Sequence, residues 1–183
     1  ADCDLLFAPD PREMYPDGRS QHTSVSVSDI TDVLCGASRP GHFTGVATVV
    51  CKLFNIVQPD MALFGEKDYQ QLAVIRCMAR ELCFPVEVIG VPTVRADDGL
   101  ALSSRNGYLG EAERIQASQL QNQLAALVAA IQSGERDFEA LCHTASRHLK
   151  MAGWRVDYVA LRDADTLQPP TSASSRLVVL GAA

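Results

Sequence analysis

The alternation of helical and strand-like apolar patterns between residues 45 and 91 constrains the fold more than any other feature of the sequence. Apolar residues follow Gly45 at the spacing of one helix face and stop before Pro59: Val46, Val49, Val50, Leu53, Phe54 and Val57. Short apolar runs at 60–64 and 86–91 are typical of buried strands, and a second helical stripe lies between them at Leu72, Ile75, Ala79 and Leu82. Because strands that are apolar on both faces and alternate with helices indicate a parallel sheet, this half is predicted to be part of a doubly wound α/β domain.

The segment before Gly45 is predicted to add two short strands. Residues 4–8 form an apolar run closed by prolines, which is typical of a buried strand, and residues 24–28 alternate like a strand at a surface. A brief helix is expected from Asp29, whose side chain can cap it. The first residue is Ala, no element precedes residues 4–8, and the last residues end in a strand without a turn. We therefore expect the chain to be cut at both ends.

The sequence changes character after Pro92. Residues 93–107 are rich in Arg, Asp and Ser. Four more elements are predicted beyond them, two helices and then two strands of a small antiparallel sheet, at 111–132, 137–152, 154–161 and 176–183. We therefore expect two domains: residues 1–92 as the remainder of a doubly wound domain and residues 93–183 as a smaller α+β domain, with residues 93–107 as the hinge.

Charge and composition exclude several classes of function. Sixteen Lys and Arg residues stand against 22 Asp and Glu residues, and the net charge of -6 repels polyanions, so neither nucleic acid nor an anionic membrane is expected as a partner. No apolar run approaches the roughly 18 residues that span a bilayer. The six cysteines form no C-x-x-C pair, which argues against a zinc or thioredoxin-like site. We expect no metal held by the protein, and reduced cysteines in a cytoplasmic protein.

Residues 64–72 (Phe-Gly-Glu-Lys-Asp-Tyr-Gln-Gln-Leu) form the first candidate binding segment. They follow a predicted parallel strand and open a helix, which is where α/β sheets bind ligands and where free N–H groups attract a phosphate or carboxylate. Gly65 lets a ligand approach the backbone, Lys67 can neutralise a phosphate, and Gln71 lies one turn further on. The motif is neither a P-loop nor a dinucleotide fingerprint, so on this pattern alone a plain helix start is the favoured interpretation.

Two loops carry further candidate residues. Ser103, Ser104 and Arg105 lie in the hinge segment and can surround a polyphosphate, since a guanidinium offers a fork of donors that suits a pyrophosphate. Taken alone, this segment is more often a solvated linker. Arg39 and His42 lie in a loop rich in Gly and Pro, where a histidine can equally be a surface or capping residue.

Taken together, these three segments indicate a particular family far more specifically than any one of them does alone. Arg39-Pro-Gly-His-Phe-Thr-Gly45, residues 64–72 and Asp98-Gly-Leu-Ala-Leu-Ser-Ser-Arg-Asn-Gly-Tyr-Leu109 closely resemble, in order and spacing, the pantothenate synthetase (pantoate–beta-alanine ligase) family. The resemblance extends from about Asp4 to the last residue. It implies a partial Rossmann-like parallel sheet of the nucleotidylyltransferase superfamily, followed by the smaller α+β domain. A homodimer is expected as well, because a sheet without its opening strands exposes an edge that self-association would cover.

The resemblance also implies roles for individual residues. Lys67, Ser103, Ser104 and Arg105 are implied to be catalytic. Gly65, Glu66, Lys67, Asp68, Val94, Leu102, Ser103, Ser104 and Arg105 are implied to bind ATP, with Leu102–Arg105 as the family's version of the K-M-S-K-S loop. Gln71 is implied to hold pantoate, and Arg39 and His42 lie in a loop that the family places close to the pantoate pocket.

The reaction that the resemblance implies belongs to pantothenate and coenzyme A biosynthesis and has two steps. The pantoate carboxylate attacks the α-phosphorus of ATP to give pantoyl adenylate and pyrophosphate, and the amine of beta-alanine then displaces AMP. Such chemistry needs no protein nucleophile. It needs positive charge at the phosphates, which Lys67, Arg105, the serine hydroxyls and Mg²⁺ would supply.

The sequence departs from the family at its ends, and this leaves other readings open. The family's amino-terminal strand and its M-G-x-L-H-x-G-H segment have no counterpart here, nor has a glutamine from that part that contacts pantoate and beta-alanine, and a final strand beyond Ala183 is expected to be missing. The chain is therefore alternatively a catalytically deficient piece that acts only as a weak nucleotide-binding or assembly module. A related nucleotidyltransferase with another acceptor and an inert structural domain are the remaining alternatives.

Overall fold

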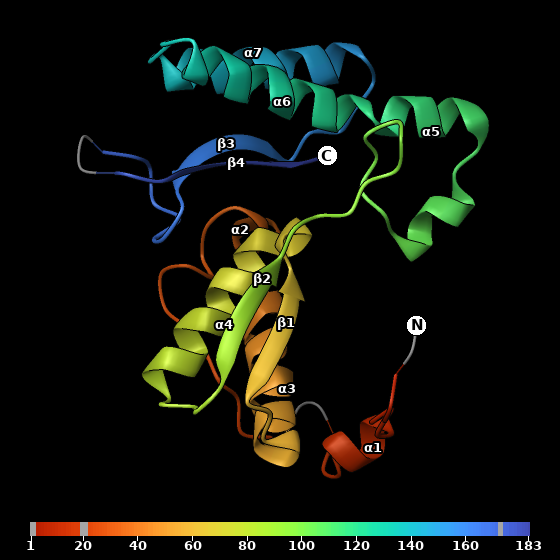
Figure 1. Ribbon diagram of the computed structural model, residues 1–183, viewed down its shortest axis with the longest axis vertical. Coiled ribbons are helices and arrows are strands. Elements are labelled where there is room, and N and C mark those ends of the chain that lie inside the picture. Colours follow the sequence, from red (N-terminus) through yellow and green to blue (C-terminus); the bar gives the residue numbers. More distant parts are fainter. Residues whose placement is uncertain (1–2, 19–21, 172–173) are drawn as a thin grey trace.

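The computed structural model describes residues 3–18, 22–171 and 174–183, and the chain forms two lobes (Figure 1). The first lobe contains α3 (His42–Val57), β1 (Met61–Gly65), α4 (Tyr69–Glu81) and β2 (Glu87–Val91). The second lobe contains α5 (Glu111–Ala117), α6 (Gln119–Gln132), α7 (Phe138–Met151), β3 (Tyr158–Asp163) and β4 (Leu177–Ala182). Four shorter elements complete the described chain: α1 (Pro11–Met14), α2 (Cys35–Ser38) and the 3₁₀ helices η1 (Glu66–Asp68) and η2 (Ser104–Tyr108). Within the described ranges, no helix has both the length and the apolar character needed to cross a bilayer.

The parallel sheet of the first lobe confirms the strand–helix–strand prediction. β1 and β2 pair in parallel, with Met61 opposite Glu87 and Gly65 opposite Val91, and α4 is the crossover between them. The predicted amphipathic helix is α3, which begins at His42, three residues before the apolar pattern. It ends where Gln58 takes a left-handed conformation (φ 51°) and donates its N–H to the Phe54 carbonyl, so Pro59 is not needed to stop it.

Only one face of the β1–β2 sheet is covered. Ala62 and Phe64 pack into the apolar cluster formed with α3 and α4, and the Phe54 ring meets the Phe64 ring edge-on at 6.4 Å. Met61 and Leu63 alternate to the other face and are 61% and 68% exposed. The prediction of strands buried on both faces is therefore wrong for the described chain, because α3 and α4 both pack on the same side. Leu82, predicted on the buried stripe of α4, is also exposed, since the helix ends at Glu81.

The two strands predicted before Gly45 are absent from the described residues. Residues 4–8 form no strand and are exposed, with Leu5 84% accessible, because no neighbouring described strand offers them a partner. Residues 24–28 form no ladder, and Val25 instead donates its N–H to Oγ1 of Thr48 in α3 at 2.9 Å. The helix expected from Asp29 is also absent, because residues 28–31 form a turn and the next helix, α2, begins only at Cys35.

The second lobe confirms the predicted pair of helices on an antiparallel sheet. β3 pairs with β4, with Tyr158 opposite Ala182, and α6 and α7 lie together over this sheet (Figure 1). The predicted helix at 111–132 is divided into α5 and α6 at Ser118, whose hydroxyl donates to the Ile115 carbonyl in competition with the helical pattern. α7 begins after Asp137, whose carboxylate accepts the Ala140 N–H at 3.0 Å.

The two lobes share one apolar cluster. Leu167, in the loop after β3, is fully buried in the cluster that contains Val74 and Ile75 of α4, and Val178 and Leu180 of β4 pack against the same cluster. The hydroxyl of Tyr69 in α4 donates to the Ala164 carbonyl at 3.0 Å. The carboxyl ends of β1 and β2 therefore face the second lobe across a packed boundary (Figure 1).

Candidate functional site

The segment after β1 places charged side chains at the carboxyl end of the parallel sheet. The chain leaves Gly65, forms η1 through Glu66, Lys67 and Asp68, and enters α4 at Tyr69. All three η1 side chains are exposed, and the Lys67 ammonium donates to the Leu102 carbonyl at 3.4 Å. The first candidate segment therefore already contacts the loop that contains the second one.

The Gly- and Pro-rich loop brings Arg39 and His42 to the same place. Gly41 has a φ of 77°, a conformation that glycine adopts without strain, and this lets α3 start at His42. Burial, and after it the positive charge of Arg39, lowers the pKa of His42, whereas the carboxylate of Asp68 acts in the opposite direction. His42 therefore lies within the electrostatic influence of both the 39–45 loop and η1.

The segment predicted as a hinge has a defined structure. Arg95 and Ala101 form an antiparallel bridge around a turn in which Gly99 has a φ of 82°. Asp98 binds Arg114 of α5, with Oδ2 2.8 Å from Nε. The Ser103 hydroxyl accepts the Arg105 N–H at 3.2 Å and caps η2.

A cavity of about 720 Å³ lies between the two lobes and is bounded by all three loops. It brings together seven of the predicted site residues: Arg39, His42, Glu66, Lys67, Asp68, Gln71 and Arg105. The other five, although described, do not line it: Gly65, Val94, Leu102, Ser103 and Ser104. Leu102 is linked to the cavity through its carbonyl contact with Lys67.

Both walls of the cavity suit a ligand with anionic and apolar parts. Within the described residues, the guanidinium groups of Arg39 and Arg105 and the amide of Gln71 have no hydrogen-bond or ion-pair partner, so they are available to an anionic ligand. Leu120 and Leu124 of α6 and the residues of β4 supply apolar surface on the second-lobe side. In the part of the chain that the structure describes, no three His, Cys, Asp or Glu side chains are grouped so as to hold a metal ion.

Several cavity residues were not predicted from the sequence. Cys35, Gln70, Arg95, Tyr158 and the residues of β4 all line it. Gln70 had a usable signal, because it lies four and eight residues before Val74 and Met78 and so falls on the buried stripe of α4. Cys35 and Tyr158 had no usable signal in the sequence, since their contact joins residues 123 positions apart in the chain.

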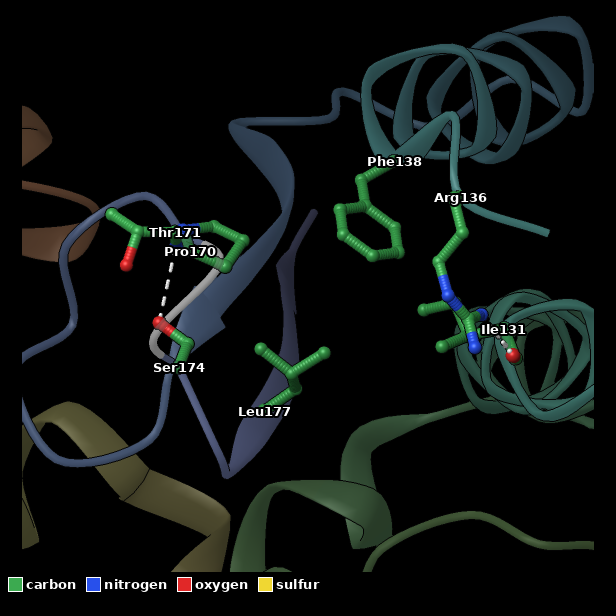
Figure 2. A pocket seen from close by; sticks show the side chains of 7 residues that line it. All are labelled: Ile131, Arg136, Phe138, Pro170, Thr171, Ser174 and Leu177. Carbon is green, nitrogen blue, oxygen red and sulfur yellow. Dashed lines mark hydrogen bonds between the residues drawn. The ribbon is translucent and has the colours of Figure 1, made fainter. Parts of the chain in front are cut away.

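A second, smaller cavity of about 460 Å³ lies at the other end of the second lobe, where Phe138 and Leu177 face the same space (Figure 2). The Arg136 guanidinium there is already bound to the carbonyls of Ile131 and Glu135. None of the predicted site residues lines this cavity. The larger cavity between the lobes is therefore the candidate site.

Comparison with known proteins points to one family. The sequence profile of the family described as Pantoate-beta-alanine ligase matches residues 1–183. Pantothenate synthetases of Pseudomonas savastanoi pv. phaseolicola (strain 1448A / Race 6) and Pseudomonas fluorescens (strain Pf0-1) are each 57% identical over 183 residues. The alignments cover 100% of this chain but 65% and 64% of those proteins, so the chain spans less than two thirds of its relatives' length.

Solved structures agree with the sequence comparison. The crystal structure of pantothenate synthetase from Thermus thermophilus superposes with a TM-score of 0.87 at 48% identity, over 98% of this chain and 65% of that one. The pantoate-beta-alanine ligase of Francisella tularensis, complexed with beta-gamma ATP and beta-alanine, gives a TM-score of 0.67 at 31% identity, over 81% and 53% of the two chains. With its α/β lobe, its small antiparallel lobe and a match along all 183 residues, the chain belongs to the pantoate-beta-alanine ligase family.

Proposed function

We propose that this chain provides the ATP and pantoate sites of a ligase that condenses pantoate with beta-alanine. The observation that carries the proposal is that Arg39, Lys67, Gln71 and Arg105, which come from three separate segments of the chain, all line a single cavity. The relative from Francisella tularensis was solved with an ATP compound and beta-alanine, which supports the same ligand classes here.

In the first step, an oxygen of the pantoate carboxylate attacks the α-phosphorus of ATP, and the bond from that phosphorus to the pyrophosphate breaks. Negative charge grows on the leaving pyrophosphate, and Lys67 and Arg105 stabilise it electrostatically. Gln71 orients pantoate with its amide, and Arg39 and His42 form the rest of the cavity surface beside pantoate. In the second step, the beta-alanine amine attacks the acyl carbon of pantoyl adenylate, loses a proton and displaces AMP.

The remaining predicted residues surround the nucleotide in this proposal. Glu66 and Asp68 border the phosphates. Gly65, Val94 and Leu102 do not line the cavity in the conformation described, and the family resemblance is what assigns them to ATP, with Val94 on the adenine side. Ser103 acts mainly by capping η2, which places Ser104 and Arg105, because its hydroxyl is already engaged by the Arg105 N–H. Mg²⁺ would enter on the phosphates of ATP; the carboxylates of Glu66 and Asp68 at the cavity fit the few protein oxygens that such an ion uses.

The division into domains 1–92 and 93–183 belongs to the same proposal, with residues 93–107 as the segment that closes over ATP. Closure would protect the mixed anhydride from water. The contact of Lys67 with the Leu102 carbonyl supports this assignment, because the segment already reaches the phosphate side of the cavity. We also propose a cytoplasmic homodimer, and sedimentation of the purified chain tests its assembly.

Pantoate-dependent exchange of pyrophosphate into ATP tests the function, because it reports the first step alone. Exchange that requires pantoate supports the ligase, whereas exchange with a different carboxylic acid indicates another acceptor. The second candidate is a nucleotide-binding module without ligase activity. It is favoured by the exposure of Glu66, Lys67 and Asp68, since exposed charges bind weakly, and ATP binding without any exchange would identify it.

A further inference from the structure

Gln70 uses its whole side-chain amide to hold one turn of the backbone. Its Nε2 donates to the carbonyls of Ile30 at 2.8 Å and Val33 at 2.7 Å, and its Oε1 accepts the Cys35 N–H at 3.1 Å. The residue is 5% exposed, and both amide donors are used. One side chain at the start of α4 therefore binds three backbone groups of the turn that precedes α2.

The turn that Gln70 holds is strained. Leu34 has a φ of 53° and a ψ of -124°, a region that residues with a Cβ rarely adopt. Gly36 packs so closely on the same turn that a Cβ there would lie 1.8 Å from the Thr31 carbonyl oxygen. Strained backbone of this kind persists only where surrounding contacts hold it in place, and two of the three hydrogen bonds of Gln70, those with Val33 and Cys35, flank Leu34 directly.

The same turn connects the cavity to both lobes. Cys35 lines the cavity, and the chain continues from it through α2 to Arg39 and His42, which also line it. The Cys35 sulfur lies 3.0 Å from the hydroxyl oxygen of Tyr158 in β3. Burial, followed by this contact, raises the pKa of Tyr158.

We propose that Gln70 is a positioning residue for the pantoate side of the site. It holds the strained turn at 33–35 and thereby places Arg39 and His42, while the Cys35–Tyr158 contact attaches this wall to the second lobe. The two neighbouring glutamines then have separate tasks, since the Gln71 amide is available to a ligand and the Gln70 amide is not. The assignment of pantoate to the side of the cavity that carries Arg39 and His42 rests on the proposed function. The contacts of Gln70 and Cys35 do not depend on it.

Site-resolved alkylation of the cysteines tests the contacts without any substrate. Gln70→Glu keeps the size and the acceptor of the side chain but replaces the donor to Ile30 and Val33 with an oxygen that repels both carbonyls. We expect iodoacetamide to modify Cys35 about fivefold faster in Gln70→Glu and in Tyr158→Phe, the factor that one lost hydrogen bond produces. Half-buried Cys142 in α7 is the internal reference, and Gln132→Glu, an exposed position in α6, controls for the added charge.

An unchanged ratio of Cys35 to Cys142 modification in these variants overturns the proposal, as does an equal rise at both cysteines, which indicates general loosening. If Gln70→Glu does not fold, hydrogen exchange of the unmodified protein decides instead. The Cys35 amide should be protected by its bond to Gln70, and rapid exchange there overturns the proposal.

Kinetics test the positioning role separately. In pantoate-dependent exchange, Gln70→Glu should raise the KM for pantoate about tenfold and leave kcat and the KM for ATP within about twofold, because Lys67 and Arg105 are not attached to this turn. Equal losses for both substrates contradict a role on the pantoate side. If the unmodified chain shows no exchange at all, the proposed function fails, and the alkylation experiment still decides on the contacts.

Discussion

Replacing Leu167 by alanine tests whether the two lobes unfold as one unit. Leu167 belongs by sequence to the second lobe, yet its side chain is fully buried in the cluster that contains Val74, Ile75 and Met78 of α4. Its φ is 57°, and alanine keeps the Cβ that makes this conformation unfavourable. The substitution therefore removes packing without relieving backbone strain.

The expected loss follows from the carbons removed. Leu167→Ala deletes Cγ, Cδ1 and Cδ2 from a fully buried site, and at about 0.8 kcal/mol per buried carbon the transfer contribution is about 2.4 kcal/mol. The cavity left behind adds to this, and Leu→Ala changes at fully buried positions cost about 3 to 5 kcal/mol in total. With a denaturant slope of about 2 kcal/mol per molar urea, we expect the midpoint to fall by about 1.5 to 2.5 M.

Urea unfolding monitored by two signals provides the measurement. The single tryptophan of the chain, Trp154, reports the second lobe, and far-UV circular dichroism reports the helices of both lobes. Because the cluster is shared, the two transitions should coincide in the original chain and in Leu167→Ala. Leu5→Ala is the matched control, since Leu5 is 84% exposed and its truncation should cost less than about 0.5 kcal/mol. A midpoint shift in Leu167→Ala no larger than that of the control refutes the reasoning.

Three further outcomes are expected. Lys67→Ala should slow pantoate-dependent ATP–pyrophosphate exchange by about a hundredfold or more, and an unchanged rate removes Lys67 from the mechanism. Arg105→Lys should weaken ATP binding about tenfold although the charge is kept, because a lysine cannot replace the planar fork; unaltered binding by calorimetry shows that Arg105 does not touch the phosphates. His42 has a pKa below its usual value of 6.5, so the unfolded chain binds the proton more readily and the free energy of unfolding should fall as pH decreases through 6.5 toward the lowered pKa. His42→Gln should lack this part of the pH dependence in denaturation midpoints measured at about pH 5 and about pH 8, and an identical profile contradicts the assignment.

The parts of the fold that were predicted correctly depend on local pattern. The stripe of α3 and the strands β1 and β2 are encoded within a dozen residues each, and a parallel pair follows from the helix between them. The wrong predictions depend on partners far away in the chain. An apolar run such as residues 4–8 has the composition of a strand whether or not another strand lies beside it, and here its side chains are exposed. Leu63 is equally apolar, but only the positions of α3 and α4 decide which face of the sheet is covered.

The candidate site shows the same distinction. Lys67 and Gln71 became candidates because they follow a predicted strand and because their segment resembles the family motif, and both line the cavity; their roles stay predictions. The hydrogen bonds of Gln70 to the turn before α2 were not predicted. They hold a strained turn around Leu34, about 35 residues earlier in the chain, and backbone strain at a non-glycine residue cannot be recognised from the sequence.

The exposure of η1 limits what the site can do in the conformation described. Two unit charges 4 Å apart interact by about 1 kcal/mol in water and by about 4 kcal/mol at the effective dielectric constant near a protein surface. Glu66, Lys67 and Asp68 are exposed, so the interaction energy of Lys67 with a phosphate lies close to the lower of these two values. Among the described residues, Lys67 makes one hydrogen bond across the cavity, to the Leu102 carbonyl at 3.4 Å. A ligand phosphate that attracts Lys67 and Arg105 together would draw residues 102–105 toward η1 and exclude water. In the proposed mechanism, the gain in electrostatic stabilisation would come with closure of residues 102–105, and the shared cluster around Leu167 and the Tyr69–Ala164 hydrogen bond would hold the two lobes together during it.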